Sequence, residues 1–221
     1  MVVQILGKQF SEAEGVGDWR VLFMGAKAYF ATGSFERGVA LIDAIAKIAE
    51  SAGHHPDIDL RYSGVIVRVF TADDHALTDL DLALARQISV AARELGIAAD
   101  PSRVQTVQLS IDALVIADIL PFWKAVLGYI KIDGEDDLED PMWNSANVTF
   151  QQMDEPRIER NRIHFDVSVP RDQAEARIAA ALAAGGHLVR DEGPWWWTLA
   201  DSEGNEVDIA PWADDQVPHS G

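Results

Sequence analysis

The connection between the first long helix and the strand after it reads Glu50-Ser51-Ala52-Gly53-His54-His55-Pro56. Proline biases the residue before it toward an extended backbone, so Pro56 favours an extended His55. Two imidazoles therefore project near one another from this connection. Histidine titrates near neutral pH, so one ring of such a pair could remove a proton while the other delivers one. The alternative for any adjacent histidine pair is a surface or capping position.

The residues on both sides of this connection predict a mixture of helices and strands. In residues 35–50 apolar side chains recur every three or four positions, as in an amphipathic helix with one buried stripe. Residues 60–71 predict a strand. Residues 79–95 predict a second helix, which Thr78 opens with Asp81 three residues on. We therefore expect an α+β fold in the first half of the chain.

A longer pattern surrounds the histidine pair. It comprises Glu50-x3-His54-His55-Pro56-x5-Tyr62, then Thr71, then Leu77-Thr78-Asp79-Leu80-Asp81, preceded by Trp19 and by Phe30-Ala31-Thr32-Gly33-Ser34-Phe35. Over about residues 10–95 this text resembles the pterin-4a-carbinolamine dehydratase family. The resemblance implies a small domain with an antiparallel sheet, helices on one face, and a tendency to oligomerise. It also implies the removal of water from a 4a-hydroxytetrahydropterin to give the quinonoid dihydropterin, without a cofactor.

The resemblance also implies roles for individual residues. His54 and His55 match the catalytic pair of the family. The family carries a third histidine directly after the threonine that matches Thr71, where this chain has Ala72. His75, three residues further on, could replace it as a displaced acid and is the third candidate catalytic residue. The substrate-binding candidates are Glu50, Pro56 and Asp81. The other reading is a domain that has lost a proton-transfer group and binds a pterin or dimerises without catalysis.

The second half of the chain contains an internal repeat. A strand at 104–111, a helix at 116–127 closed by Gly128, and short strands to Gln152 are followed by the same order. The second copy has a strand at 162–169, a helix at 172–184 closed by Gly185, and short strands to Ile209. The interval is 57 residues from Gly128 to Gly185 and from Gln151 to Asp208, and 56 from Gln108 to His164. A duplicated β-α-β-β-β unit is the simplest interpretation.

Polar residues alternate with apolar ones along four strands of this half, and residues of like parity share one face of a strand. If the two repeats close into a curved sheet, one polar residue from each strand can meet the others at the centre. Three further stretches complete the pattern: Phe122-Trp123-Lys124-Ala125-Val126-Leu127-Gly128-Tyr129, Asn161-Arg162-Ile163-His164-Phe165-Asp166 and Asp201-Ser202-Glu203-Gly204-Asn205-Glu206-Val207-Asp208. Over about residues 104–212 this text resembles the glyoxalase, bleomycin-resistance and extradiol dioxygenase superfamily, the vicinal oxygen chelate proteins.

The second resemblance implies a metal site but no single activity, because the superfamily includes lyases, dioxygenases and metal-free binding proteins. Its ligand positions fall on Gln108, Gln151, His164 and Asp208. One imidazole, one carboxylate and two amides form a poor zinc site but could hold Mn²⁺ or Ni²⁺ with water completing the coordination. The alternative is a polar cup whose side chains bind a small ligand or water.

Composition limits the remaining function classes. Lys and Arg number 18 against 36 Asp and Glu, a formal net charge of −18 that repels the phosphate backbone of nucleic acids. The absence of cysteine excludes disulfides and thiolate sites. The apolar stretches at 40–49 and 113–127 contain charges and fall short of the roughly 20 residues that a bilayer requires, and residues 1–10 lack the pattern of a signal peptide. We expect a cytoplasmic protein with neither nucleic-acid nor membrane partners.

The two halves are expected to form separate domains. Residues 1–103 carry 10 basic and 14 acidic side chains, whereas residues 104–221 carry 8 and 22. Between them, Gly96 ends a helical pattern and Pro101 follows, which is typical of a helix stop and a linker. We predict domains at 1–99 and 104–215 in a homo-oligomeric protein. Its expected function is that of a hydro-lyase acting on a small-molecule pterin, with a divalent metal or small ligand in the second domain.

Overall fold

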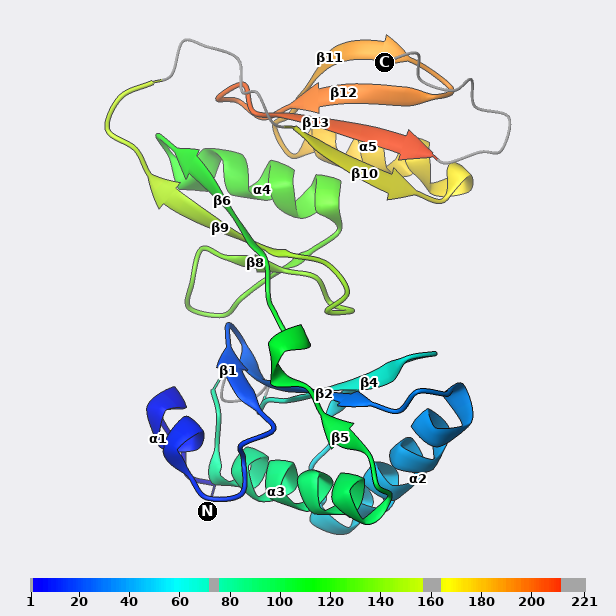
Figure 1. The fold of residues 1–221 in the computed structure, drawn as a ribbon. Helices are drawn as coiled ribbons and strands as arrows, with labels where there is room; N and C mark the ends of the chain where they lie inside the picture. Colours follow the sequence, from blue (N-terminus) through cyan, green and yellow to red (C-terminus); the bar gives the residue numbers. More distant parts are fainter. Residues whose placement is uncertain (1, 72–75, 157–163, 212–221) are drawn as a thin grey trace. The chain divides into compact units, whose positions relative to one another are not determined.

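The computed structural model describes residues 2–71, 76–156 and 164–211, and it divides the chain into two compact units, Met1–Thr106 and Val107–Gly221 (Figure 1). The two units have the α+β fold class that the sequence predicts, an antiparallel sheet with helices followed by a paired β-α-β-β-β arrangement. None of the helices in the described ranges is long and apolar enough to cross a membrane.

The first unit is an antiparallel sheet in the order β1-β2-β4-β3, with a short fifth strand, β5, paired to β2. Figure 1 shows the two long helices, α2 and α3, on the same side of this sheet. The apolar faces of both helices pack with Phe30 of β2 and Val67 of β4 in one hydrophobic core. The elements are α1 (Gly7–Glu12), β1 (Arg20–Leu22), β2 (Gly25–Ala31), α2 (Phe35–Ala52), β3 (Asp57–Arg61), β4 (Gly64–Val69), α3 (Asp79–Glu94), β5 (Ala98–Ala99) and the 3₁₀ helix η2 (Pro101–Arg103).

Helix α2 confirms the expectation for residues 35–50 and continues to Ala52. Its start is capped by Ser34, whose side chain accepts a hydrogen bond from the Arg37 N–H. Its end is closed by Gly53 in the left-handed conformation, with φ of 61°, where glycine has no Cβ to clash. The His54 N–H then bonds the Ala49 carbonyl. This ending sets the direction in which the histidine pair leaves the helix.

The single strand expected over residues 60–71 is wrong: the chain reverses within it. Strands β3 and β4 form a hairpin in which Arg61 pairs with Gly64 across a two-residue turn. The Tyr29 hydroxyl donates to the Ser63 carbonyl at 3.0 Å, and a Cβ on Gly64 would lie 2.5 Å from the Tyr29 ring. The turn therefore depends on a close approach from β2 that only glycine at position 64 permits.

The stretch from Gly96 to Ser102, expected to be a linker, is built into the first unit. Ile97 is buried, Ala98 and Ala99 pair with β2, and Pro101 opens η2. Asp100 caps that turn through Ser102, and the Ser102 hydroxyl holds the pKa of Asp100 below its ordinary value. The first compact unit, which ends at Thr106, includes this stretch.

The sheet face opposite the core carries a row of charges. Arg20, Lys27, Arg68 and Asp57 stand at directly opposing positions on β1, β2, β4 and β3. Burial lowers the pKa of Lys27, and the neighbouring Arg68 lowers it further, whereas Asp57 acts in the opposite direction. The Asp57 carboxylate accepts a 2.7 Å hydrogen bond from Arg68 Nε.

The second unit consists of two four-stranded sheets with identical topology, β6-β9-β8-β7 and β10-β13-β12-β11. In each, the first strand in sequence is parallel to the last, and a helix follows the first strand. The duplicated β-α-β-β-β unit is therefore confirmed. The elements are β6 (Gln108–Ala113), α4 (Ile116–Leu127), β7 (Ile130–Lys131), β8 (Leu138–Glu139), β9 (Asn147–Gln152), β10 (Phe165–Val169), the 3₁₀ helix η3 (Arg171–Gln173), α5 (Ala174–Ala183), β11 (His187–Glu192), β12 (Trp196–Ala200) and β13 (Glu206–Pro211).

Helix α4 has the predicted limits and ends at Gly128, which has φ of 72°. The expected helix over 172–184 divides into η3 and α5. The strand expected at 104–111 begins later, as β6, because its pairing with β9 starts at Gln108. The start of the strand expected at 162–169 lies outside the described residues, and β10 begins at Phe165.

One buried turn joins the second repeat to the helix of the first. Asp201, which is fully buried, accepts a 2.9 Å hydrogen bond from the Trp123 indole N–H of α4. Two residues on, the carboxylate of Glu203 accepts from the Leu114 and Val115 N–H groups at 2.7 and 2.8 Å, just before α4. The turn between β12 and β13 thus satisfies backbone donors at the start of α4.

Candidate functional site

His54 is held by a buried carboxylate. Its Nε2 lies 2.8 Å from Asp81 Oδ1, and the side chains of His54 and Asp81 are 12% and 0% exposed. Asp81 is the third residue of α3, so the contact ties the end of α2 to the start of α3. An ionised carboxylate has only acceptors, so the His54 Nε2 donates.

The other oxygen of Asp81 is also engaged. Asp81 Oδ2 lies 2.8 Å from the Thr71 hydroxyl, 3.1 Å from the Thr78 hydroxyl and 2.8 Å from the Thr78 N–H. Thr78 and Asp81 form the capping box of α3, which is why this carboxylate faces inward. The Thr71 and Thr78 hydroxyls are 2.8 Å apart. Asp81 is therefore fixed on both sides, and His54 is oriented with it.

His55 has a more open environment. Its Nε2 lies 3.2 Å from Glu50 Oε1, and the two side chains are 61% and 78% exposed. Water screens such a pair, so Glu50 orients His55 only weakly. The adjacent histidines thus differ in burial and in partner, one fixed by Asp81 and the other close to solvent.

The remaining candidates of the first unit are placed as follows. Pro56 is partly exposed directly after His55. His75 and Ala72 lie outside the described residues, so the proposed replacement of the third histidine stays a prediction. Thr71 and Thr78 were not predicted as site residues. The capping signal at Thr78 and Asp81 was legible in the sequence, but the contact of Thr71 with Asp81 joins residues ten positions apart from different elements.

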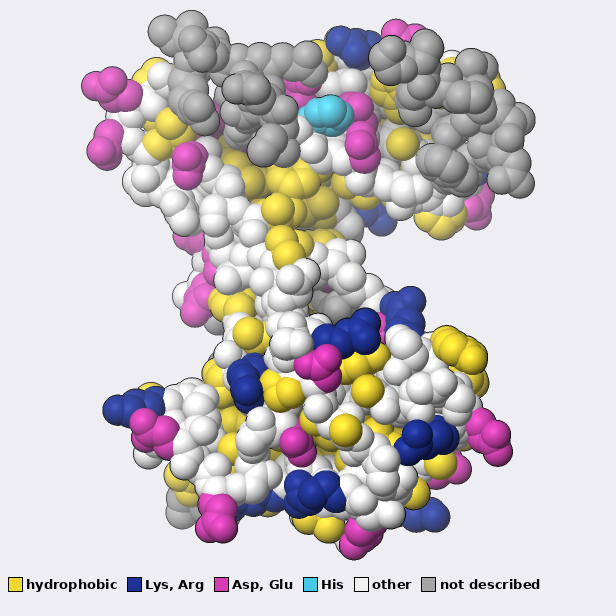
Figure 2. Space-filling view, in the orientation of Figure 1, with side chains coloured by type: hydrophobic (Ala, Val, Ile, Leu, Met, Phe, Trp, Pro, Cys, Tyr) yellow, Lys and Arg dark blue, Asp and Glu magenta, His cyan; other side chains and the backbone are white. Residues whose placement is uncertain are grey.

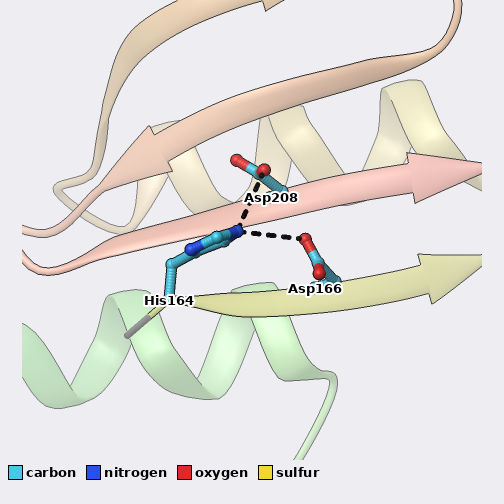
Figure 3. Close-up of side chains that lie close together, drawn as sticks. All are labelled: His164, Asp166 and Asp208. Atoms are coloured by element: carbon cyan, nitrogen blue, oxygen red, sulfur yellow. Dashed lines mark ion pairs between the residues drawn. The ribbon is translucent and has the colours of Figure 1, made fainter. Parts of the chain in front are cut away.

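The second unit brings His164, Asp166 and Asp208 together (Figure 3). One ligand atom from each lies within 4.8 Å of the others, and His164 Nε2 is 3.7 Å from Asp166 Oδ1 and 3.8 Å from Asp208 Oδ2. Asp166 and Asp208 are opposing residues of parallel strands β10 and β13, and His164 directly precedes β10. Figure 2 shows a histidine beside acidic side chains on the visible surface of this unit.

The donor set fits a divalent cation. One imidazole and two carboxylates are a borderline-hard combination that suits Mn²⁺, Fe²⁺ or Ni²⁺, with water in the open positions. All three groups are partly or fully exposed. Asp166 was not predicted as a ligand, although its parity with His164 places it on the same face of the strand.

The two glutamines of the predicted ligand set lie on the first sheet of this unit. Gln108 stands opposite Asn147, and Gln151 stands opposite Asp112. They are therefore four residues, about 13 Å, apart along the paired strands. Gln151 Nε2 donates to the Ser110 hydroxyl at 3.5 Å. A single ion could bind both glutamines only if these two long side chains leaned toward each other, whereas the ligand atoms of His164, Asp166 and Asp208 already lie within 4.8 Å of one another.

Two solved structures match parts of the chain at low sequence identity. The transcriptional coactivator/pterin dehydratase of Brucella melitensis matches at 23% identity and a TM-score of 0.38, over 40% of this chain and 98% of that protein. The fosfomycin resistance protein FosX of Mesorhizobium loti matches at 8% identity and a TM-score of 0.41, over 49% of this chain and 92% of that one.

Sequence comparison gives the family. The family model described as pterin 4 alpha carbinolamine dehydratase matches residues 7–91, and the one described as glyoxalase-like domain matches residues 108–210. A provisionally named pterin-4-alpha-carbinolamine dehydratase of Nocardia farcinica is 48% identical over 60 residues, 27% of this chain and 63% of that protein. A protein of the same provisional name from Chloroflexus aurantiacus is 39% identical over 71 residues, 32% of this chain and 76% of that protein. The chain therefore spans less than two thirds of the Nocardia relative and about three quarters of the Chloroflexus one. Through its first unit the chain belongs to the pterin-4-alpha-carbinolamine dehydratase family, and its second unit is similar to the glyoxalase-like domain over residues 108–210.

Proposed function

We propose that the first unit removes water from a pterin 4a-carbinolamine, with His54 and His55 as the proton-transfer pair. The observation that carries the proposal is the 2.8 Å contact between His54 Nε2 and the buried Asp81. A buried carboxylate that orients an imidazole is the arrangement by which general bases are commonly held. Family membership supports the pterin as the substrate class.

The geometry favours His54 as the base. Because Nε2 donates to Asp81, a neutral His54 carries its lone pair on Nδ1. Nδ1 would take the proton from the ring nitrogen of the carbinolamine, and the electrons of that N–H bond would form the C=N bond. The nearby negative charge of Asp81 would stabilise the imidazolium that results.

His55 suits the complementary step. As the 4a C–O bond breaks, a protonated His55 would give its proton to the leaving hydroxyl, which departs as water. One proton is taken and one is given, so the pair returns to its starting state after a proton passes between the histidines or through solvent. The exposure of His55 and Glu50 favours this exchange with water. Glu50 and Pro56 remain the proposed substrate-binding positions, whereas Asp81, which is fully buried and bonded through both oxygens, would orient His54 and not contact the pterin.

The test is the dehydration of chemically generated 4a-carbinolamine, followed by absorbance in a stopped-flow instrument. We expect His54→Ala to lower the rate by about 10²- to 10⁴-fold, the usual contribution of a positioned acid or base. His187→Ala is the matched control, since His187 is exposed on β11 of the other unit. A wild-type rate no greater than the uncatalysed rate contradicts the enzyme proposal. Pterin binding without turnover would then favour the alternative, a non-catalytic binding or dimerising unit.

A second proposal concerns the glyoxalase-like unit, where His164, Asp166 and Asp208 would hold a divalent cation. The observation behind it is the convergence of their ligand atoms within 4.8 Å. A bound cation would act there as a Lewis acid toward an oxygen of a small ligand. Without a cation, the same residues would form a polar surface for hydrogen bonding.

Titration calorimetry with Mn²⁺ tests this second proposal on the full chain. We expect Asp208→Asn to weaken Mn²⁺ binding by at least tenfold, because it replaces an anionic ligand with a neutral amide. Asp43→Asn, which removes an exposed carboxylate of α2, is the control and should bind as the wild type does. An absence of Mn²⁺ and Ni²⁺ binding by the wild type would remove metal-dependent lyase or dioxygenase chemistry from consideration.

We also propose that the chain forms a homo-oligomer, as the resemblance of the first unit suggests. Phe35 and Val39, one turn apart on α2, are 52% and 40% exposed. Light scattering with Phe35→Ser and Val39→Ser variants tests whether this apolar stripe contributes. A monomeric wild type contradicts the proposal.

A further inference from the structure

We propose that Thr71 and Thr78 are positioning residues that fix Asp81, and through it the tautomer of His54, so that His54 transfers protons only through Nδ1. The inference deepens the proposed dehydration and rests on it for its catalytic meaning. Neither threonine needs to contact the substrate.

The hydroxyl groups of Thr71 and Thr78 have fewer protons than they have contacts, which determines which group donates to which. Thr71 Oγ1, Thr78 Oγ1 and Asp81 Oδ2 make three mutual contacts of 2.8, 2.8 and 3.1 Å, but the two hydroxyls supply only two protons. The two short contacts form a chain in which Thr78 donates to Thr71 and Thr71 donates to Asp81. The longer Thr78–Asp81 contact is then the one without a hydroxyl proton, and the Thr78 N–H serves Oδ2 instead. Thr71 is therefore the hydroxyl on which the orientation of Asp81 most depends.

Burial makes this orientation matter. Asp81 and Thr78 are fully buried, so water cannot replace a lost donor without a change in packing. With Oδ2 occupied by Thr71 and Thr78, Oδ1 is the oxygen left for His54. A rotation of the carboxylate would break its contacts with His54, Thr71 and Thr78 together. Thr71 and Thr78 thus keep Asp81 Oδ1, which accepts a hydrogen bond, directed toward His54 Nε2.

The consequence for His54 follows from the chemistry of imidazole. In the neutral ring only one nitrogen carries hydrogen, and an acceptor at Nε2 selects the Nε2–H tautomer. Within the part of the chain that the structure describes, His54 Nδ1 has no hydrogen-bond partner. Among the described residues, the one hydrogen-bond partner of the His55 side chain is the exposed Glu50 at 3.2 Å, so His55 is not fixed in this way. The two adjacent histidines are therefore expected to differ in tautomer.

Nitrogen NMR of the full-length protein, labelled with ¹⁵N, tests the proposal without any activity assay. The signals of His54 are identified by their loss in His54→Gln. We expect one neutral tautomer, Nε2–H, in the wild type, and averaging between both tautomers in Thr71→Val. Thr71→Ser, which keeps the hydroxyl, should restore the wild-type signals. Thr32→Val is the control, because Thr32 is a buried threonine of the same unit whose hydroxyl donates to the Ser34 carbonyl.

If Thr71→Val does not fold, Asp81→Asn provides a second test of the same proposal. Asp81→Asn offers an amide that can donate to His54, so the Nδ1–H tautomer should become populated. Wild-type His54 signals in Thr71→Val, or a single Nε2–H tautomer in Asp81→Asn, would overturn the proposal.

Steady-state kinetics of the Thr71 variants distinguishes a failure of the positioning role from a failure of the proposed dehydration. If the wild type dehydrates the carbinolamine, Thr71→Val should lower kcat by about tenfold with KM nearly unchanged, and Thr71→Ser should recover most of it. Dehydration with an unchanged kcat in Thr71→Val rejects the positioning role alone. No dehydration by the wild type rejects the proposed function, and the NMR result still decides whether the threonines fix His54.

Discussion

The indole N–H of Trp123 donates a 2.9 Å hydrogen bond to Asp201 across 78 residues of sequence. Trp123 belongs to the helix of the first repeat, and Asp201 to the turn between the last two strands of the second. Asp201 also accepts from the Glu203 and Asn205 N–H groups and from the Asn205 side chain. One buried carboxylate therefore joins the two repeats of the glyoxalase-like unit.

Replacing this carboxylate should destabilise the second unit. Asp201→Ala leaves several buried donors without an acceptor, and we expect a loss of about 3 kcal/mol in the free energy of unfolding. Urea denaturation followed by tryptophan fluorescence measures it. Asp112→Asn, at an exposed position of β6, is the matched control and should change stability by less than about 0.5 kcal/mol. Equal stability of the two variants would show that the buried turn does not tie the repeats together.

The hairpin of the first unit should not tolerate a side chain at Gly64. A Cβ there would lie 2.5 Å from the Tyr29 ring and 2.6 Å from the Phe30 carbonyl. We expect Gly64→Ala to cost at least about 2 kcal/mol through displacement of strand β4 from β2. Gly17→Ala meets no atom within 4 Å and serves as the control. The comparison is made by thermal unfolding, and a wild-type midpoint for Gly64→Ala would contradict it.

Lys27 should make stability depend on pH in the alkaline range. Burial and Arg68 lower its pKa below the usual 10.5, so the folded state disfavours the charged amine. Between the lowered pKa and 10.5 the unfolded chain binds more protons, and this contribution to stability therefore rises with pH. Lys27→Met removes the cost of the charge, so its midpoint of unfolding should exceed the wild-type midpoint at pH 7.

The advantage of Lys27→Met should shrink as the pH rises through the lowered pKa toward 10.5, because the wild-type amine loses its charge in the folded state while the unfolded chain still holds part of its protons. Thermal unfolding of the two proteins at pH 7 and pH 10.5 gives the difference directly. Lys47→Met, at an exposed position of α2, should show neither effect. A constant difference between Lys27→Met and wild type across this range would mean that the charge of Lys27 carries no cost in the folded state.

Local patterns were sufficient for most helices. Residues 116–127 were predicted with the observed limits because their apolar periodicity ends at Gly128, whose left-handed conformation closes the helix. The repeat interval likewise predicted the shared topology of the two sheets in the second unit. The single strand predicted over residues 60–71 was wrong, because strand-forming residues continue on both sides of a tight reversal. The turn there depends on Tyr29, from a different strand.

The candidate sites also depend partly on local sequence and partly on tertiary structure. The sequence itself determined that His54 and His55 are adjacent, that Thr78 and Asp81 cap a helix, and that His164 and Asp166 share one face of a strand, because these relationships follow from backbone geometry over a few residues. Only the tertiary structure decided that Asp81 reaches His54, that Thr71 holds Asp81, and that Asp208 stands beside Asp166. Those contacts arise from the packing of α2 against α3 and from the pairing of β10 with β13, which local patterns do not encode.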